Sequence, residues 1–432
     1  MSRPRPRSHS LVRAVPAALT PIALVFAAAC SSGDQPDAAS DATAYEGARL
    51  IVGDGGDAIE NATFVVENGR FTAVGRSGEV DVPPGAARVD LTGRTVMPAI
   101  VNTHMHLPST RAERTEQLRH NAYYGAAAVT SMGLDDGEVP LQMSDEVIPG
   151  AARALSAGPG ITRPEPGRSE VPYWIDTPEA GRQAVADMAG QGVDLVKIWV
   201  DDRNGRYEKM TPELYGPVIE EAHEHGLRVA AHIFALEDAK GLVRADIDAF
   251  AHGVRDQDVD DEFVAMITAE PDIFYIPNLP DPGVARELSW LAGTIPADEL
   301  SEMQADASDG GSPSEGFMIQ ARNLARLNAA GVRIAFGTDG GSPWAAHLEL
   351  EDMVLAGMTP AEVVVAATRN SAELLRLDDL GTIEPGKSAA FLVLDGNPLD
   401  DITNSRRIES VFLRGVEVDR AGFSAQVMGA AQ

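Results

Sequence analysis

The chain has 432 residues, of which 44% are hydrophobic, so it is long enough to bury a barrel of roughly 250 residues together with a smaller domain. Its 65 acidic residues outnumber its 35 basic residues, which gives a formal net charge of −30. A surface with this charge repels phosphate backbones and anionic lipids. The composition therefore argues against nucleic acid as a partner.

The first 29 residues have the pattern of a signal peptide. Four arginines lie within the first 13 residues, and an apolar run follows from position 14 to position 29. The run contains two prolines and is shorter than the about 20 residues that a membrane-spanning helix needs. It ends in small residues directly before Cys30, the only cysteine, in an arrangement that resembles a bacterial lipobox. We predict that residues 1–29 are cleaved and that Cys30 is lipidated; an ordinary signal peptide beside an incidental cysteine is the alternative.

An anchor of this kind determines where the protein works and what can stabilise it. We predict an exported protein that is held at the periplasmic or extracellular side of a bacterial membrane through its N-terminal lipid alone. With Cys30 modified, no disulfide can form within the chain, and stability must come from packing. Residues 30–43 are small and polar without apolar periodicity, which is typical of a flexible tether.

Short alternating strands are predicted near both ends of the chain. Residues 44–95 contain strand patterns separated by Gly, Asn-Gly and Pro-Pro turns, and the pair Asn68 and Gly69 between two apolar runs is a strong hairpin signal. A similar pattern returns in residues 380–420. We predict that the two segments assemble into one small composite β-sandwich domain.

Residues 96–379 alternate apolar strand-like runs with helix-like stretches, the pattern of parallel βα units. One of the helices is expected to begin at Pro178, with Thr177 as its cap. Eight runs are predicted to be strands: AIVNTHMH, AAAVTSM, RALSA, DLVKIWV, LRVAAHI, IDAFAHG, DIFYIP and VRIAFGTD. The expected fold class is α/β, with a (β/α)8 TIM barrel inserted between the halves of the β-domain. In such a barrel the chemistry belongs at the carboxyl ends of the strands.

One long segment interrupts the alternation of strands and helices. Residues 279–316, between the last two predicted strands, include the acidic sequence PADELSEMQADASDGGSPSEG, which is rich in Gly and Ser. A long excursion at the catalytic face can act as a lid or as a substrate loop. A solvated surface loop without such a role fits the composition equally well.

Two histidines end the first predicted barrel strand. Residues two apart on a strand point to the same face, so His104 and His106 can both point into the barrel and bind one ion, while Met105 faces the helices. Asp339 ends the last predicted strand, where a carboxylate can ligate the same ion and pass a proton from its bound water to a leaving amine. A cap of the following helix is the alternative role for Asp339.

A lysine lies in the middle of the fourth predicted strand. A buried charged amine carries a large desolvation cost, so Lys197 would tend to lose its proton. A neutral amine can react with carbon dioxide, and the anionic carbamate that results has two oxygens able to bridge two cations. The alternatives are that Lys197 reaches the barrel mouth or pairs with an acid such as Asp201.

Single histidines end the next two predicted strands. Either His232 or His252 alone would be an ordinary core residue, but their placement at successive strand ends predicts metal ligands. Tyr275 and Asn278 end the seventh strand, and His347 follows the eighth strand closely, so we expect these three side chains to contact substrate.

Together these residues resemble the amidohydrolase superfamily, and most closely its imidazolonepropionase-like and prolidase-like branch. The resemblance runs from about residue 44 to residue 418 and rests on VMPAIVNTHMH, GTDGG, AGMTPAEVVVAATRNSAELL and LGTIEPGKSAAFLVLDGNPL. It implies a hydrolase for C–N bonds of amides, cyclic amides or small N-acyl or dipeptide-like substrates, with two divalent cations, usually zinc, and a metal-bridging hydroxide as nucleophile. It also implies the metal ligands: His104, His106 and Asp339 for one ion, His232 and His252 for the other, and a carboxylated Lys197 as the bridge.

Three positions depart from the pattern of that branch. Asn102 stands where an aspartate is common, and Ala99 replaces a usual glycine, but neither is among the implied ligands. Phe234 stands where prolidase-like members commonly carry a second histidine. Without that polar side chain, the resemblance alone does not predict dipeptidase specificity.

Two other functions remain open at this stage. The first is a mononuclear deaminase that acts on a heterocycle, although a one-metal site needs no bridging lysine. The second is a substrate-binding lipoprotein without activity, against which the complete ligand set argues. The sequence identifies neither the substrate nor the oligomeric state, since the loops that select substrate are the least interpretable part.

Overall fold

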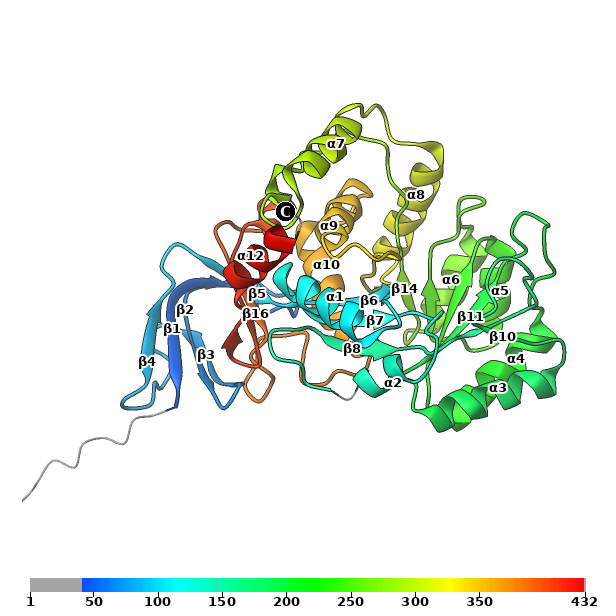
Figure 1. Cartoon of the computed structure of the whole chain (residues 1–432), viewed down its shortest axis with the longest axis horizontal. Helices are drawn as coiled ribbons and strands as arrows, with labels where there is room; N and C mark the ends of the chain where they lie inside the picture. The colour runs from blue at the N-terminus through cyan, green and yellow to red at the C-terminus, as the bar shows by residue number, and fades with distance from the viewer. Residues whose placement is uncertain (1–40, 145, 431–432) are drawn as a thin grey trace, which may run out of the picture. The chain divides into compact units, whose positions relative to one another are not determined.

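Strands from both ends of the chain form one mixed sheet of eight strands in the computed structural model, which describes residues 41–144 and 146–430 (Figure 1). The amino-terminal strands are β1 (Thr43–Leu50), β2 (Ile59–Glu67), β3 (Arg70–Arg76), β4 (Ala87–Asp90) and β5 (Thr95–Pro98). The carboxyl-terminal strands are β16 (Phe391–Leu394), β17 (Ile408–Leu413) and β18 (Val416–Glu417). Their order is β18-β17-β16-β5-β1-β2-β3, with β4 paired to β1.

This single sheet corrects the prediction of a β-sandwich. β5 pairs parallel to β1 and antiparallel to β16, so the strands of the two chain ends share one ladder instead of forming two sheets. The sheet nevertheless encloses an aromatic core. Tyr45 stacks on Phe64 with 4.9 Å between ring centroids, Phe391 stacks on Phe412 at 4.5 Å, and Tyr45 meets Phe391 edge to face at 5.3 Å.

The predicted hairpin joins β2 to β3. Glu67 pairs with Arg70, and the two residues between them, Asn68 and Gly69, have positive φ angles of 52° and 75°. Both residue types tolerate this backbone conformation, which two-residue hairpin turns require. The hairpin prediction is confirmed, whereas the limits 44–95 and 380–420 for a separate domain stay a prediction.

All eight predicted barrel runs contain a parallel strand. They are β6 (Ile100–Met105), β7 (Ala126–Ser131), β8 (Arg153–Ser156), β11 (Val196–Val200), β12 (Val229–Ile233), β13 (Ala249–Ala251), β14 (Phe274–Ile276) and β15 (Arg333–Ile334). Two further short strands, β9 (Ile161–Thr162) and β10 (Tyr173–Trp174), were not predicted. The parallel strands form a sheet of three in the order β6-β7-β8 and a sheet of seven in the order β10-β9-β11-β12-β13-β14-β15.

The described strands therefore do not form the single closed ladder that a (β/α)8 barrel was predicted to have. At one junction, β9 pairs with the edge of β11, so it takes the place beside β11 that was expected for β8. At the other junction, β15 has only two residues, and its continuation meets β6 through separate contacts. These include the hydrogen bond from the Thr103 N–H to the Phe336 carbonyl, at 2.9 Å, and a single bridge between Met105 and Gly340.

The helices follow the strands and cover their outer side (Figure 1). Thr177 accepts a hydrogen bond from the Ala180 N–H at 3.2 Å, and the helix begins at Pro178, as predicted. The helices between and after the parallel strands are α1 (Arg111–Tyr123), α2 (Val139–Ser144), α3 (Pro178–Gln191), α4 (Pro212–Glu224), α5 (Leu236–Arg244), α6 (Asp261–Ala269), α8 (Glu315–Ala329), α9 (Ala345–Leu355), α10 (Pro360–Val365) and α11 (Ser371–Leu374).

The insertion at 279–316 contains a short 3-10 helix, η1 (Ser289–Leu291), and α7 (Ala297–Ser308). Leu288, Leu291 and Ile295 form a buried cluster with Tyr124, which follows α1. The insertion is therefore partly packed against the fold and is not a wholly solvated loop, although α7 itself buries no residue. A last helix, α12 (Arg420–Ala430), contacts α1.

The faces of the parallel strands alternate as predicted, and this alternation positions the site. On β11, Val196, Ile198 and Val200 pack in the core between strands and helices. Leu195 belongs instead to a second cluster that is lined by alanines and Phe274 from neighbouring strands. Met105 packs against helix residues, so the opposite face of β6 carries His104.

The predicted signal peptide, Cys30 and most of the tether lie outside the described residues. Within residues 41–144 and 146–430, no helix combines the length and the apolar character needed to cross a membrane.

Candidate metal centre

Three of the predicted ligands converge on one carboxylate group. Oδ1 of Asp339 lies 3.0 Å from Nε2 of His104 and 3.2 Å from Nε2 of His106. The donor atoms of the three side chains all lie within 4.8 Å of one another. Two ligand atoms on a tetrahedral ion, each about 2.0–2.1 Å from it, are roughly 3.3 Å apart. The spacing and the donor types of this group therefore fit a divalent metal ion.

A hydrogen bond fixes the orientation of the His104 ring. Its Nδ1–H donates to Oδ1 of Asn278 at 3.0 Å, which leaves the lone pair of Nε2 toward Asp339. Burial, followed by the charge of Lys197, lowers the pKa of His104 to about 4, so the ring is neutral near pH 7. A neutral imidazole whose other nitrogen is held by an oxygen acceptor has the form in which histidine ligates metals.

Backbone conformation also aims these side chains. Asn278 and Asp339 have left-handed φ angles of 43° and 49°, and His252 has φ of 152°. Such values cost free energy in most residues other than glycine, and least in Asn and Asp, which also adopt them in turns. Gly337, two residues before Asp339, faces His104 so closely that a Cβ atom would lie 2.7 Å from the histidine Cβ. Only glycine fits at that position without a shift.

Lys197 is 1% exposed and its Nζ has no hydrogen-bond partner among the described residues. Burial is the main reason that its pKa falls to about 7; Asp339 opposes this effect, whereas Arg255 and Arg203 add to it. A substantial fraction of the amine is therefore neutral near pH 7. Its charge influences His104 and His252, which places it beside the predicted ligands. A buried amine that has no hydrogen-bond partner and lies 5.6 Å from the centroid of the Trp199 ring fits a modification that would supply oxygen ligands.

His252 and His232 continue the cluster away from the first group. The His252 ring centroid lies 5.0 Å from that of His104 and 4.5 Å from that of His232, and Nδ1 of His252 is 3.5 Å from Oδ2 of Asp339. Burial lowers the pKa of both rings well below the usual value, so both are neutral. The six predicted ligand positions lie on or directly after β6, β11, β12 and β13, except Asp339, which lies five residues after β15; Lys197 is the second residue of β11.

Charged residues that the sequence did not single out surround His232. Its Nε2 lies 2.8 Å from Nη1 of Arg203 and 3.2 Å from Nη2 of Arg255. Asp201, an alternative partner predicted for Lys197, instead lies 3.0 Å from His232 and 2.8 Å from Arg203. The sequence did contain a signal for these residues. Asp201 and Arg203 follow β11 and Arg255 follows β13, and strand ends carry the chemistry in this fold.

Two of the three predicted substrate contacts lie elsewhere. Tyr275 is 1% exposed on the face of β14 that packs toward helices, and its hydroxyl accepts the Val254 N–H at 3.2 Å. His347 is fully buried in α9, where its ring nitrogens contact Oγ of Ser405 and the Tyr124 carbonyl. The structure brings neither of them to the histidine cluster. The third residue, Asn278, reaches the cluster as the partner of His104.

Comparisons with known proteins agree with this architecture. Residues 207–418 match the model of the amidohydrolase family. An imidazolonepropionase from Agrobacterium fabrum is 26% identical over 392 residues, which cover 79% of this chain and 86% of that protein. The chain belongs to the amidohydrolase superfamily.

Solved structures of other proteins match nearly the whole fold. A proposed prolidase from Bifidobacterium longum is 29% identical with a TM-score of 0.72, and the match covers 91% of this chain and 100% of that one. An Xaa-Pro dipeptidase with bound methionine in its active site is 23% identical with a TM-score of 0.70, over 87% of this chain and 99% of that one. The latter likeness concerns the fold alone.

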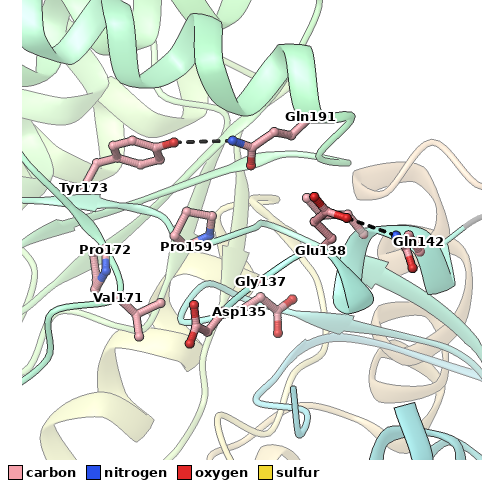
Figure 2. Close-up of a pocket in the computed structure, with 11 residues that line it drawn as sticks. Asp135, Gly137, Glu138, Gln142, Pro159, Val171, Pro172, Tyr173 and Gln191 are labelled. Atoms are coloured by element: carbon pink, nitrogen blue, oxygen red, sulfur yellow. Dashed lines mark hydrogen bonds between the residues drawn. The ribbon is translucent and has the colours of Figure 1, made fainter. Parts of the chain in front are cut away.

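Two cavities of this amidohydrolase differ in their position relative to the cluster. The larger, of about 730 Å³, lies beside the loops after β7 and β8, and Figure 2 shows Asp135, Glu138 and Tyr173 in its wall. None of the six predicted ligands lines it. The smaller, of about 300 Å³, includes Thr338 and Leu279, the chain neighbours of Asp339 and Asn278. None of the six predicted ligands lines the smaller cavity either, so it adjoins the candidate metal site only through these two neighbours.

Residues of the insertion contribute to this smaller cavity. Arg286 and Leu288 line it together with α9, and Arg286 binds Asp352 of α9 through both carboxylate oxygens at 2.6 and 2.8 Å. This ion pair fastens the insertion to α9 beside the site. The insertion therefore borders this cavity, and its role as a lid or substrate loop stays a prediction.

Proposed function

We propose that the protein is a metal-dependent hydrolase that cleaves C–N bonds of amides, cyclic amides or small N-acyl or dipeptide-like substrates. The observation that carries the proposal is the convergence of His104, His106 and Asp339, with their donor atoms within 4.8 Å of one another, at the strand ends of an amidohydrolase. No other group of three or more His, Cys, Asp or Glu side chains with such spacing occurs within the described ranges.

A second cation, most simply zinc like the first, is part of this proposal. His232 and His252 would hold it, and Lys197 would bridge the two ions as a carbamate. The buried, unpartnered Nζ of Lys197 and its lowered pKa support this role, because only the neutral amine reacts with carbon dioxide. We also propose that the two parallel sheets act as the wall of one barrel, since hydrogen bonds such as that between Thr103 and Phe336 span one junction.

The chain's own groups supply orientation and proton transfer in this scheme. When bound, the cations would supply a polarised carbonyl and a water ionised near neutral pH. Asp339 lies at hydrogen-bonding distance from His104 and His106, so it can accept a proton from water there and donate it to the leaving nitrogen. Burial alone would raise the pKa of Asp339, but the opposite effect of His104 and His106 is larger and lowers the pKa. Asp339 is therefore a carboxylate before the reaction begins. Asn278 keeps the His104 ring in its ligating form.

A one-metal deaminase of heterocycles is the second candidate, and one observation favours it. The first group of three ligands is complete without His232, whose Nε2 faces two arginines instead of an open space. Two positive groups beside a ligand oppose a second cation, and the carboxylate of Asp201, 3.0 Å from the same nitrogen, offsets them only in part. One bound ion per chain would favour the deaminase.

The activity is tested with metal-loaded protein on N-acyl amino acids, Xaa-Pro dipeptides and lactams. The expected result is turnover of at least one amide or lactam that disappears in His104→Ala and in Asp339→Ala. A matched control is His223→Ala, since His223 lies on α4 and its Nε2 contacts Asp248, not the cluster. Turnover that persists in both His104→Ala and Asp339→Ala would contradict the proposal.

We further propose that the protein is exported and held at the membrane by lipid on Cys30. The pattern of the first 30 residues supports this localisation. A small-molecule substrate would then be met outside the cytoplasm.

A further inference from the structure

The larger cavity, of about 730 Å³, is walled by three separate segments of the chain. Residues of the segment 135–142 follow β7, Pro159 follows β8, and residues 171–173 reach into β10 (Figure 2). Ligand sites for small organic molecules commonly have volumes of about 300–1,000 Å³. None of the six predicted metal ligands lines this cavity. Its size therefore suits a small molecule, and its position is separate from the candidate metal centre.

Hydrogen bonds hold these segments together. The N–H of Asp135 donates to the Gly158 carbonyl at 3.1 Å, and the N–H of Tyr173 donates to the Gly160 carbonyl at 2.9 Å. Arg114 donates to both carboxylate oxygens of Asp135, at 2.9 and 3.2 Å, and neither side chain is more than 2% exposed. The cavity is therefore preformed, which lowers the cost of ordering its walls around a ligand.

One part of the wall is acidic. Among the described residues that line the cavity, three are carboxylates and none is basic. Arg114 neutralises Asp135, but Asp136 and Glu138 form no ion pair with any described residue, and both are exposed. The Gln142 amide donates to Glu138 at 3.4 Å but carries no charge. Two negative charges therefore border the cavity without a counterion, so it attracts cations and repels anions.

Another part of the wall is apolar and aromatic. Figure 2 shows Val171, Pro172 and Tyr173 across the cavity from Glu138. Tyr173 is half-buried, and its hydroxyl accepts a hydrogen bond from Nε2 of Gln191 at 3.4 Å, which restrains the ring. The face of a tyrosine ring attracts a positive group. A ligand that matches both parts of the wall therefore has one positive group and an apolar body.

We propose that this cavity is a second ligand site, which binds a small organic cation with an ammonium group joined to an apolar body. Asp136 and Glu138 would pair with the ammonium group. The apolar body would lie against Val171, Pro172 and Tyr173. A divalent metal ion fits less well, because the candidate metal centre is the only group of three such donors with ligand spacing in residues 41–144 and 146–430. The proposal does not depend on the proposed hydrolase activity.

Binding of two matched probes tests this site. 2-Phenylethylamine is an ammonium ion near pH 7, and 2-phenylethanol is its uncharged analogue. Each is titrated into the zinc-loaded full-length chain with ligand-observed NMR. The amine should bind more tightly than the alcohol, and added salt should reduce the difference because exposed charges are screened. Asp136→Asn and Glu138→Gln should each weaken binding of the amine by about 2- to 5-fold, the effect of one exposed ion pair, and leave the alcohol unchanged.

Two further variants serve as controls. Glu302→Gln removes one negative charge from α7, which buries no residue and contributes nothing to this cavity, so it should bind the amine as the wild type does. His104→Ala disrupts the candidate metal centre and should also retain the amine, since His104 does not line the cavity. Asp136 and Glu138 are exposed, so their amide variants should keep the wild-type melting temperature.

Three results would overturn the inference. The first is an amine that binds no more tightly than the alcohol. The second is an affinity for the amine that Asp136→Asn and Glu138→Gln change no more than Glu302→Gln does. The third is loss of amine binding in His104→Ala, which would place the amine at the metal centre. A chain that shows the predicted preference but hydrolyses no amide would leave the second site standing and contradict only the proposed hydrolase.

Discussion

Asn278 offers the sharpest test of how the fold prepares the metal ligands. It is 8% exposed, and its Oδ1 is the acceptor for Nδ1–H of His104, which is 1% exposed. The perturbation is Asn278→Gly, because the left-handed φ of 43° suits glycine and would strain alanine. The buried N–H of His104 then loses its acceptor, which costs about 1–3 kcal/mol. If the metal-bound state bears this whole cost, zinc affinity falls by about 5- to 150-fold.

Competition with a chromogenic chelator measures that affinity. Asn278→Asp keeps an acceptor and tolerates the same backbone conformation, so its zinc affinity should stay within a few-fold of the wild type. Asn323→Ala is the control for general damage, since Asn323 is buried and makes hydrogen bonds to Val254, Val259 and Gln257. It should lower the free energy of unfolding while the zinc affinity is retained. Wild-type zinc affinity in Asn278→Gly would refute the reasoning.

Three further predictions concern charge and localisation. Burial lowers the pKa of His120 and of His347 to about 4, whereas the unfolded chain takes up these protons near pH 6.5. The urea concentration at the unfolding midpoint of the metal-free protein should therefore be lower at pH 5 than at pH 7. A higher midpoint at pH 5 would count against this reasoning. Lys197→Met removes a buried amine, so it should raise the melting temperature of metal-free protein while metal content drops; unchanged metal content would disprove the bridging role. Cys30→Ser should move the protein from the membrane fraction to the soluble fraction, and retention at the membrane would refute lipidation.

Alternation along the strands made much of the fold and part of the site predictable. The sequence pattern predicted eight of the parallel strands. Because side chains alternate along a strand, it also predicted that Lys197 and Ile198 lie on opposite faces of β11. The same rule could have corrected the prediction for Tyr275. Phe274 and Ile276 face the alanine-lined cluster, so Tyr275 between them must face the helices, whereas Asn278 faces inward.

Other features depend on contacts that a local pattern does not contain. Ala249 and Ala251 face inward, so a regular strand would turn His252 outward, and only its φ of 152° brings it to His232. β9 and β10 have two residues each, too few for any periodicity. The partners of Arg203 come from segments up to 38 residues away, and the sequence gives no measure of that approach. The join of β5 to both β1 and β16, which makes one sheet instead of a sandwich, is likewise a long-range pairing.

The number of metal ions per chain tests the central claim most directly. Full-length protein is loaded with zinc, freed of excess metal and assayed by elemental analysis beside Asp339→Ala and Lys197→Met. The account predicts two ions per wild-type chain and a clear loss in both variants. A wild-type chain that retains no metal, or variants that retain as much as the wild type, would contradict it.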